Sequence, residues 1–413
     1  MKRTILVSAY GCEPGKGSEQ GVGWNWVLQL AKVATVVVVT RSNNREAIAA
    51  SLPVSMEGQI HFIYYDLPSI FRRLKRKERS LYLYYALWQW GAYKCAKREI
   101  SQRAIDYVMH LTFGSIWLPT FMHRLPVPFI WGPVGGGEAV PWKLIGMLPL
   151  QSRLVQYARY ALLACLGFNP LFMGPARKAK IILARTADTA RSIPQRFSAK
   201  TRTMLETAAS EEWFGELQSH CGERFTSPVL AIYTGRLVPF KNLQMALRAL
   251  AVARGRGANI EFLIVGDGPL EHSLSRQAVQ EGIADAVTFL GRRTQREVLE
   301  LLSKSDLYLF PSLREGGVWS LMEALAVGLP AICVRTSGMA VIADPGCARF
   351  IEIARAEEMV EAFAEALCEL AADPEKRRKM GAAARARMMR EFRWEQKASF
   401  MASVLDDIES SRV

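Results

Sequence analysis

Two cations near the middle of the sequence are spaced in a way that suits a diphosphate. Arg236 and Lys241 lie five residues apart and follow Gly235, which ends an expected strand at 229–234. A guanidinium offers a fork of N–H donors and an ammonium offers a point charge, so the two together suit neighbouring phosphate groups. Cations in a surface loop are more often merely solvated. The interpretation of this pair as a diphosphate site therefore depends on the other motifs of the chain.

Two glutamates lie further along the chain. Glu315 is in a glycine-rich loop, and Glu323 is in the first turn of an expected helix. A carboxylate accepts hydrogen bonds from vicinal hydroxyls, as a ribose or hexose ring offers them, and the loop N–H groups suit a phosphate. The alternatives are a solvated loop acid for Glu315 and a capping box with Ser320 for Glu323. The loop between the glutamates begins with Gly316, Gly317 and Val318.

A second glycine-rich loop, 11–21, follows the first expected strand and opens a helix. Its glycines, among them Gly17, would let the backbone approach a ligand, and the helix N-terminus offers N–H groups to a phosphate. The spacing differs from the Gly-x-Gly-x-x-Gly of a dinucleotide site. A tight turn with Ser18 as the N-cap is the alternative.

The elements that must position these residues alternate between strand and helix, which predicts an α/β fold with parallel sheets. The alternation of strands and helices begins again after a polar stretch between residues 207 and 227. We therefore predict two Rossmann-like domains, 1–207 and 208–394, that face each other across a cleft, with a C-terminal helix, 395–413, that crosses back to the first domain. The expected strands are 5–9, 33–40, 60–64, 107–110, 129–131 and 181–184, then 229–234, 262–265, 287–289, 307–310 and 331–334.

The charge of the 413-residue chain is unevenly placed. Residues 1–200 hold 27 Lys and Arg against 10 Asp and Glu, whereas the whole chain has a net charge of +14. A basic half indicates an anionic partner, and without a zinc finger or an aromatic RNA-binding signature nucleic acid is the least favoured one. Seven scattered cysteines and the lack of a signal peptide or a long apolar run favour a cytoplasmic protein.

One segment, 71–98, combines nine basic residues and a single acid with aromatic residues. A basic, aromatic-rich helix suits the interface of an anionic bilayer, so we predict membrane contact here; a packed helix with a solvated basic face is the alternative. The residues expected at the membrane are Arg72, Arg73, Lys75, Arg76, Lys77 and Trp88.

Taken in this order, the three motifs resemble family 4 of the retaining glycosyltransferases, whose members adopt the GT-B fold. The stretches 265–269 and 289–291 add to the resemblance, which is most specific in residues 229–335. Gly317 stands where the family usually has an aromatic residue. The first half is similar to a subgroup that commonly builds cell-surface polysaccharides or exopolysaccharides.

The resemblance implies roles for individual residues. Arg236 and Lys241 would bind the donor diphosphate, Glu315 would contact the donor sugar, and Glu323 would hold the ribose hydroxyls. The implied donor site comprises Gly17, Gly235, Arg236, Lys241, Gly291, Glu315, Gly316, Gly317, Val318 and Glu323. The implied catalytic residues are His110, Arg236, Lys241 and Glu315.

Two features of the first half belong to the expected acceptor side. His110 ends the strand 107–110 and would sit beside the reacting centre, although an ordinary buried histidine is equally expected. Three consecutive glycines precede Glu138, and they cost backbone entropy that a nearby ligand would justify. Gly136 and Glu138 are therefore acceptor candidates, with a plain loop as the alternative.

The expected activity is transfer of a sugar, with retention, from a nucleotide-diphosphate sugar to a glycan or a lipid-linked glycan. The chain has no Asp-x-Asp sequence, so we expect neither a metal nor another cofactor. The expected location is cytoplasmic, peripheral on the inner face of the cytoplasmic membrane. The alternatives are another enzyme on the same fold, such as an epimerase or a phosphorylase, and a non-catalytic protein that binds glycans or membranes.

Overall fold

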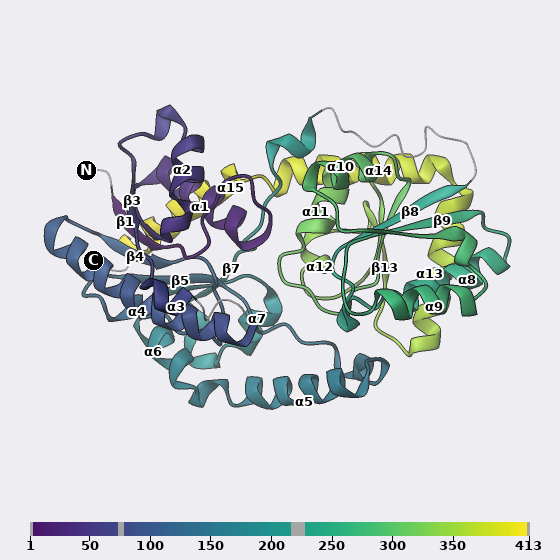
Figure 1. Cartoon of the computed structure of the whole chain (residues 1–413), viewed down its shortest axis with the longest axis horizontal. Coiled ribbons are helices and arrows are strands. Elements are labelled where there is room, and N and C mark those ends of the chain that lie inside the picture. The colour runs from purple at the N-terminus through teal and green to yellow at the C-terminus, as the bar shows by residue number, and fades with distance from the viewer. Residues whose placement is uncertain (1–2, 73–77, 216–227, 411–413) are drawn as a thin grey trace. The chain divides into compact units, whose positions relative to one another are not determined.

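The computed structural model describes residues 3–72, 78–215 and 228–410 (Figure 1). Its contacts divide the chain into two compact units. The first unit comprises 1–137, 162–207 and 394–413, and the second comprises 138–161 and 208–393. Each unit has one parallel sheet with helices, which confirms the predicted α/β class. The segment 138–161 groups with the second unit, although the sequence placed it in the first domain.

The first sheet has seven parallel strands in the order β3-β2-β1-β4-β5-β6-β7. Strands β1 and β2 are nearly continuous runs of buried Val, Ile and Leu, and β4 and β5 are buried along their whole length, as expected where both faces of a parallel sheet are covered. The six strands predicted in this half are present. The short edge strand β7 was not predicted, because three partly exposed residues leave no hydrophobic pattern. The strands are β1 Thr4–Ser8, β2 Thr35–Thr40, β3 Ile60–Tyr64, β4 Tyr107–His110, β5 Phe129–Val134, β6 Ala179–Ala184 and β7 Thr201–Thr203.

The helices of the first half follow the strands in alternation. They are α1 Ser18–Val33, α2 Arg45–Ser51, α3 Ser69–Arg72, α4 Glu78–Gln102, α5 Leu150–Ala164, α6 Pro170–Lys178 and α7 Ala187–Ser192. Together with the sheet, α4 and α6 enclose one hydrophobic core that includes Trp88, Trp131 and Phe172.

The C-terminal helix α15, Glu395–Ser410, packs against α1 of the first unit, as predicted. Polar contacts fix it there: Arg3 donates to Glu409 over 2.8 Å, and Lys32 lies 3.5 Å from Glu395. The ammonium of Lys397 is buried and donates to the carbonyl of Leu205 over 2.7 Å. Burial lowers the pKa of Lys397 to about 8.

The second sheet has six parallel strands in the order β10-β9-β8-β11-β12-β13. The five strands predicted in this half are present, and the edge strand β13 is additional. The strands are β8 Val229–Thr234, β9 Ile260–Val265, β10 Val287–Gly291, β11 Leu307–Phe310, β12 Ala331–Val334 and β13 Ala348–Ile351. The helices are α8 Leu243–Gly255, α9 Glu271–Gln280, α10 Gln295–Ser303, α11 Trp319–Ala326, α12 Met339–Ile342, α13 Ala356–Ala372 and α14 Pro374–Glu391.

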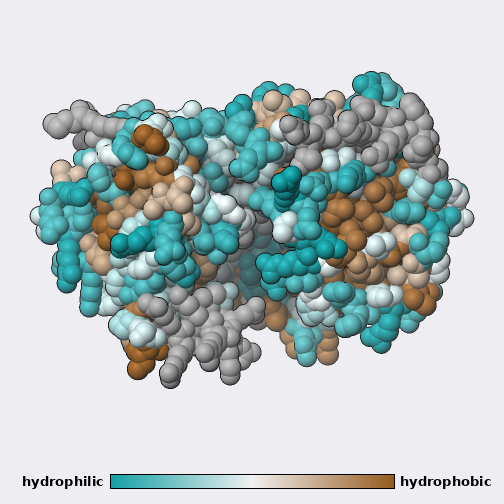
Figure 2. Space-filling view, turned by 45° about the horizontal axis from the view of Figure 1, so that its top comes forward, coloured by the Kyte–Doolittle hydropathy of each residue, from teal (hydrophilic) through white to brown (hydrophobic). Residues whose placement is uncertain are grey.

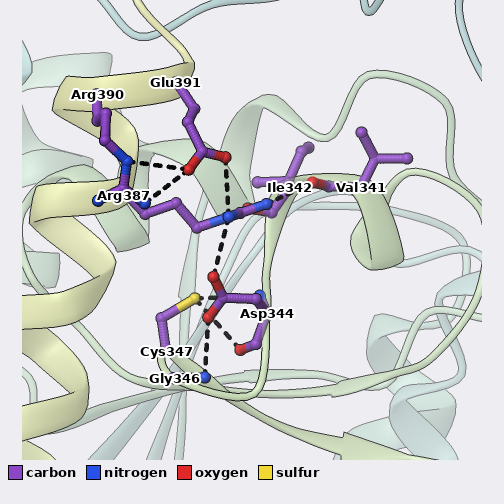
Figure 3. A network of polar contacts seen from close by, with 8 residues as sticks. All are labelled: Val341, Ile342, Asp344, Gly346, Cys347, Arg387, Arg390 and Glu391. Carbon is purple, nitrogen blue, oxygen red and sulfur yellow. Dashed lines mark hydrogen bonds and ion pairs between the residues drawn. The ribbon is translucent and has the colours of Figure 1, made fainter.

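An arginine on α14 holds the loop between α12 and β13 (Figure 3). Arg387 donates to the carbonyls of Ile342 and Val341 over 2.9 and 3.1 Å, and to the carboxylate of Asp344 over 2.9 Å. The other oxygen of Asp344 accepts from the backbone N–H of Gly346. One largely buried guanidinium thereby satisfies two carbonyls and orders the entry into β13.

We expect Arg387→Ala to lower the free energy of unfolding by about 2–4 kcal/mol, because it leaves carbonyls and a carboxylate without their charged donor. Urea denaturation measures the effect. Arg390→Ala is the matched control on the same helix: Arg390 is 67% exposed and pairs with Glu391, so it should cost less than about 1 kcal/mol. Equal losses in the two variants would contradict the bridging role.

Candidate functional site

Three loops of the second unit come into backbone contact at the carboxyl ends of their strands. Gly235 donates to Val265 and Gly266 donates to Gly291, each over 2.9 Å. Gly266 has a φ of +136°, and a Cβ there would lie 2.0 Å from the carbonyl oxygen of Gly235. Glycine is therefore required at Gly266, because a side chain would push the loops after β8 and β9 apart.

These loops line a cavity of about 350 Å³, here called the second-unit cavity. Three arginines and one aspartate provide its charge. Arg236 was predicted, whereas Arg292 and Arg293 were missed; their signal was their place directly after the strand-ending Gly291. The lining residues are Thr234, Gly235, Arg236, Val265, Gly266, Asp267, Arg292, Arg293 and Val298. The excess of guanidinium groups suits an anionic, phosphorylated ligand.

The predicted residues Lys241 and Glu315 lie together in the structure. The ammonium of Lys241 is 2.5 Å from Oε1 of Glu315, and both side chains are largely buried, at 13% and 12% exposed. The same oxygen accepts from the hydroxyl of Ser312 over 2.5 Å, and the ammonium lies 4.9 Å from the ring centre of Phe310. The solvated-acid alternative for Glu315 is therefore wrong: its carboxylate is held by a cation and a hydroxyl.

The glycine-rich loop after Glu315 is held by a residue that the sequence did not single out. Gly338 donates to the carbonyl of Glu315 over 3.3 Å. A Cβ at Gly338 would lie 1.9 Å from the carbonyl oxygen of Gly316. The loop Gly316–Val318 thus depends on a glycine in the turn after β12. Gly317 is partly exposed and Val318 is buried.

Glu323 is a buried carboxylate on α11. It is 7% exposed, and Oε1 accepts from the amide of Gln295 over 3.1 Å. Burial raises the pKa of Glu323 from 4.5 to about 7. The capping alternative is wrong, because the N-cap position is Val318 and no side chain caps this helix. The side chains of Gln295 and Trp319 are neutral, so this buried carboxyl has no cation as a partner in these contacts, and a hydroxyl-bearing ligand would stabilise it further.

The first unit has a larger cavity of about 460 Å³, here called the first-unit cavity. Its lining was not predicted as a set, although Glu19 belongs to the loop 11–21. Phe113 has a φ of +53°, and its N–H donates to the buried carboxylate of Glu19 over 3.0 Å. Burial raises the pKa of Glu19. The lining residues are Glu19, Tyr82, Phe113, Gly114, Ser115, Trp117, Leu118 and Arg185.

Gly17 is exposed and forms the N-cap of α1 with an extended backbone. The alternative in which Ser18 is the N-cap is wrong, since Ser18 is already the first helical residue. Gly17 is not among the residues that line the first-unit cavity.

His110 is buried at the end of β4, where Nε2 lies 3.3 Å from the hydroxyl of Tyr85. Gln89 donates to the same hydroxyl over 2.9 Å and contacts Ser8 over 3.4 Å. Burial lowers the pKa of His110 to about 4, so the ring is neutral near pH 7. This histidine therefore has hydrogen-bonding partners of its own within the core.

The loop of three glycines packs closely against side chains. A Cβ at Gly135 would lie 1.8 Å from Nε of Arg185, and Gly136, with a φ of +110°, accepts from the indole of Trp117 over 2.9 Å. Close packing against side chains thus explains these glycines without a ligand. Glu138 is 3% exposed, and its carbonyl accepts from Arg159 over 2.6 Å.

The prediction that Trp88 contacts a membrane is wrong. Trp88 is fully buried, and its indole donates to the carbonyl of Tyr65 over 2.9 Å, so it is a core residue and cannot enter a lipid interface. Its helical spacing also fits the core face of α4, which the sequence could not distinguish from a lipid-facing stripe. Arg73, Lys75, Arg76 and Lys77, as well as the side chain of Arg72, lie outside the described residues.

None of the helices in the described ranges has the length and hydropathy needed to cross a membrane. Within 3–72, 78–215 and 228–410, no group of three or more His, Cys, Asp or Glu side chains is arranged to hold a metal ion.

Comparison with known proteins gives the class to which this architecture corresponds. Residues 222–387 match the family model of glycosyl transferases group 1. A solved glycosyltransferase involved in lipopolysaccharide biosynthesis superposes with a TM-score of 0.60 at 15% identity, covering 97% of this chain and 99% of its own. The fold is thus GT-B, with two Rossmann-like domains, as predicted.

Two curated relatives are similar in sequence. A GDP-mannose-dependent monoacylated alpha-(1-6)-phosphatidylinositol monomannoside mannosyltransferase of Corynebacterium glutamicum is 29% identical over 206 residues, which cover 48% of this chain and 52% of the relative. An amylovoran biosynthesis glycosyltransferase of Erwinia amylovora is 33% identical over 118 residues, 27% of this chain and 29% of the relative. The chain therefore spans about half or less of the length of these relatives.

We expect ionisation of Glu323 to destabilise the folded protein. Its folded pKa of about 7 exceeds its ordinary value of 4.5, so the folded state binds the proton more tightly and stability falls as pH rises through this interval. The free energy of unfolding of the wild type, relative to Glu323→Gln, should therefore fall by about 1–3 kcal/mol between pH 5 and pH 8.

Denaturant titrations at the two pH values measure this difference. Glu281→Gln removes a carboxylate from an exposed position in the same unit, and it should show no comparable pH dependence. A constant difference between wild type and Glu323→Gln would contradict the buried, protonated state.

Proposed function

We propose that the protein is a glycosyltransferase that moves a sugar from a nucleotide-diphosphate sugar to a glycan or lipid-linked glycan acceptor, in the synthesis of a cell-surface polysaccharide. The second-unit cavity carries the proposal. It lies at the carboxyl ends of parallel strands, where such sheets bind ligands, and Arg236, Arg292 and Arg293 give it a positive wall. The match of residues 222–387 to a glycosyltransferase family supports it.

In the proposed reaction the acceptor hydroxyl oxygen bonds to the anomeric carbon while the bond from that carbon to the diphosphate oxygen breaks. The hydroxyl proton leaves with the diphosphate, and attack and departure take place on the same face, which retains the configuration. Negative charge develops on the leaving diphosphate, so Arg236 and Lys241 would act most strongly in the transition state. Glu315, by pairing with Lys241 at 2.5 Å, would position that ammonium.

Glu323 and the glycine loops would complete the donor site. A ribose hydroxyl that donates to Glu323 would offset the cost of its burial, since hydrogen bonding favours the charged carboxylate. Gly235, Gly291 and the loop Gly316–Val318 offer backbone N–H groups near the strand ends. Gly17 remains a proposed phosphate or sugar contact.

The acceptor would bind in the first unit. The first-unit cavity combines the aromatic rings of Phe113 and Trp117 with the polar groups of Glu19 and Arg185, a combination that suits a sugar ring with its apolar and hydroxyl-bearing faces. Gly136, whose carbonyl accepts from the indole of Trp117, stays an acceptor candidate on this side. Glu138, which begins the segment that groups with the second unit, stays an acceptor candidate as well. His110 would influence the reaction as a neutral imidazole.

We further propose that the protein works in the cytoplasm, peripherally on the inner face of the cytoplasmic membrane, without a metal or other cofactor. The net charge of +14 supports an anionic surface as a partner. A lipid-linked acceptor would be reached there.

A screen of sugar nucleotides tests the proposed activity and separates its rivals. GDP-mannose is the first donor to try, because the corynebacterial relative is named as dependent on it. A transferase releases nucleoside diphosphate, slowly with water and faster with an acceptor. An epimerase would change the sugar without releasing the nucleotide, a phosphorylase would require inorganic phosphate, and a non-catalytic protein would bind without turnover. Any of these three outcomes would overturn the proposal.

We expect Lys241→Ala to lower kcat by about 10²–10³-fold while it raises the donor Kd by less than about tenfold. The diphosphate gains charge as the glycosidic bond breaks, so the ammonium contributes more in the transition state than in the ground state. Steady-state kinetics and isothermal titration calorimetry measure the two quantities.

Arg314→Ala is the control for Lys241→Ala. Arg314 precedes Glu315 but stacks on Phe240, with 4.8 Å between the guanidinium carbon and the ring centre, so its loss should change kcat little. If Lys241→Ala weakened donor binding as much as turnover, the ammonium would bind substrate and transition state equally, and its catalytic role would be wrong.

A further inference from the structure

Exposed apolar side chains concentrate in two segments of the chain, 70–90 and, more densely, 142–171. Of the 17 large hydrophobic side chains that are exposed in the described ranges, eight lie between Trp142 and Leu171. Phe168, at 87%, is the most exposed of all. The face of the molecule in Figure 2 mixes hydrophobic patches with hydrophilic ones. Because exposed apolar side chains on a soluble surface are normally scattered, this concentration indicates a surface that binds a partner.

Helix α5, drawn at the lower edge of Figure 1, carries most of this apolar surface. Its exposed arc contains Leu150, Leu154 and Tyr157 at helical spacing, flanked by Val155 and Leu162. Their exposed fractions lie between 43% and 70%. Gln151 is the single long polar side chain on this arc.

The opposite side of α5 is polar and faces inward. Gln156 is 5% exposed and accepts from the N–H of Val140 over 3.4 Å, while Arg159 donates to the carbonyl of Glu138 and Tyr160 to that of Val140. A helix of a soluble domain normally buries its apolar stripe and exposes its polar one. Helix α5 has the reverse arrangement, with its polar groups engaged by the preceding segment.

The positive charge of the segment around α5 favours an anionic partner. Residues 139–187 contain seven Lys and Arg and no Asp or Glu. A self-complementary dimer through this face would bring two such basic segments together, which is unfavourable. An anionic lipid surface offers apolar chains for the exposed arc and negative headgroups for the cations.

We propose that the apolar face of α5, defined as Leu150, Leu154, Val155, Tyr157 and Leu162, docks the protein on an anionic phospholipid bilayer. The helix lies in the interface and does not cross it, because its 15 residues span about 22 Å, less than the roughly 30 Å of a hydrocarbon core. Trp142 packs on Tyr157 and Tyr160 and is 63% exposed, so it extends the same face with a residue suited to headgroup depth. This docking does not depend on the transferase activity proposed above.

Cysteine chemistry supplies a local probe. Cys165, just beyond α5, is exposed, and it is the only cysteine in the exposed class among the described residues. Cys221 lies outside the described residues, so the experiment uses a variant in which serine replaces it. The full-length Cys221→Ser protein, labelled at Cys165 with an environment-sensitive fluorophore, should show a blue shift with vesicles of phosphatidylcholine and phosphatidylglycerol. Vesicles of phosphatidylcholine alone should give a weaker shift, and salt should reduce the first signal.

The variant Leu154→Ser/Val155→Ser should lower partitioning into the anionic vesicles by about tenfold or more in a flotation assay, because two inserted apolar side chains are lost. Val279→Ser/Met389→Ser is the matched control: these side chains of α9 and α14 are exposed by 67% and 45%, and their loss should leave partitioning unchanged. Circular dichroism and thermal denaturation establish that both variants are folded.

Three results would overturn the proposal. In the first, the wild-type protein does not float with anionic vesicles at low salt. In the second, Leu154→Ser/Val155→Ser floats as well as the control variant. In the third, the wild type would form a dimer that Leu154→Ser/Val155→Ser dissociates, without binding vesicles, and the face would then be a contact between two copies.

Discussion

The second-unit cavity depends on the close approach of backbone loops at the carboxyl ends of β8, β9 and β10. The carbonyl oxygen of Gly235 occupies the place that a Cβ at Gly266 would need, 2.0 Å away. Backbone hydrogen bonds then join Gly235 to Val265 and Gly266 to Gly291. Because Gly235 and Gly266 have no side chains, the loops come into contact. Arg236, Arg292 and Arg293 then line one cavity. The absence of a side chain at Gly266 is thus a condition for the cation-lined cavity.

Electrostatics in this unit follow from burial. Lys241 and Glu315 lose most of their contact with water and so depend on each other, while Glu323 has the neutral side chains of Gln295 and Trp319 as partners. A carboxyl in that position has a raised pKa, about 7, and gains stability from any group that donates to it. The folded protein therefore contains a buried carboxyl whose neutral form is favoured, and titratable groups with shifted pKa values are common at binding sites.

The first unit shows the same use of close packing with different side chains. Its glycines at 135–137 admit Arg185, Trp117 and the hydroxyl of Thr189, and Phe113 adopts a left-handed backbone that brings its N–H to Glu19. Helix α15 ties its C-terminal segment to α1. Helix α5 is the exception, because its polar residues face the protein and its apolar residues face outward.

The sequence by itself determined the α/β class, eleven of the thirteen strands and the return of α15, because buried parallel strands are continuous apolar runs that can be read locally. It also determined which charged residues deserved attention in the second half. Two edge strands escaped prediction, since partly exposed runs of three or four residues have no such pattern. The tertiary structure alone decided that Lys241 pairs with Glu315, that Glu323 is buried rather than capping α11, and that Arg292 and Arg293 share a cavity with Arg236. It also decided that Trp88 belongs to the core while the apolar face of α5 does not. These outcomes depend on which side of an element faces which neighbour, and that is fixed by packing between residues far apart in the chain, about which local spacing carries no information.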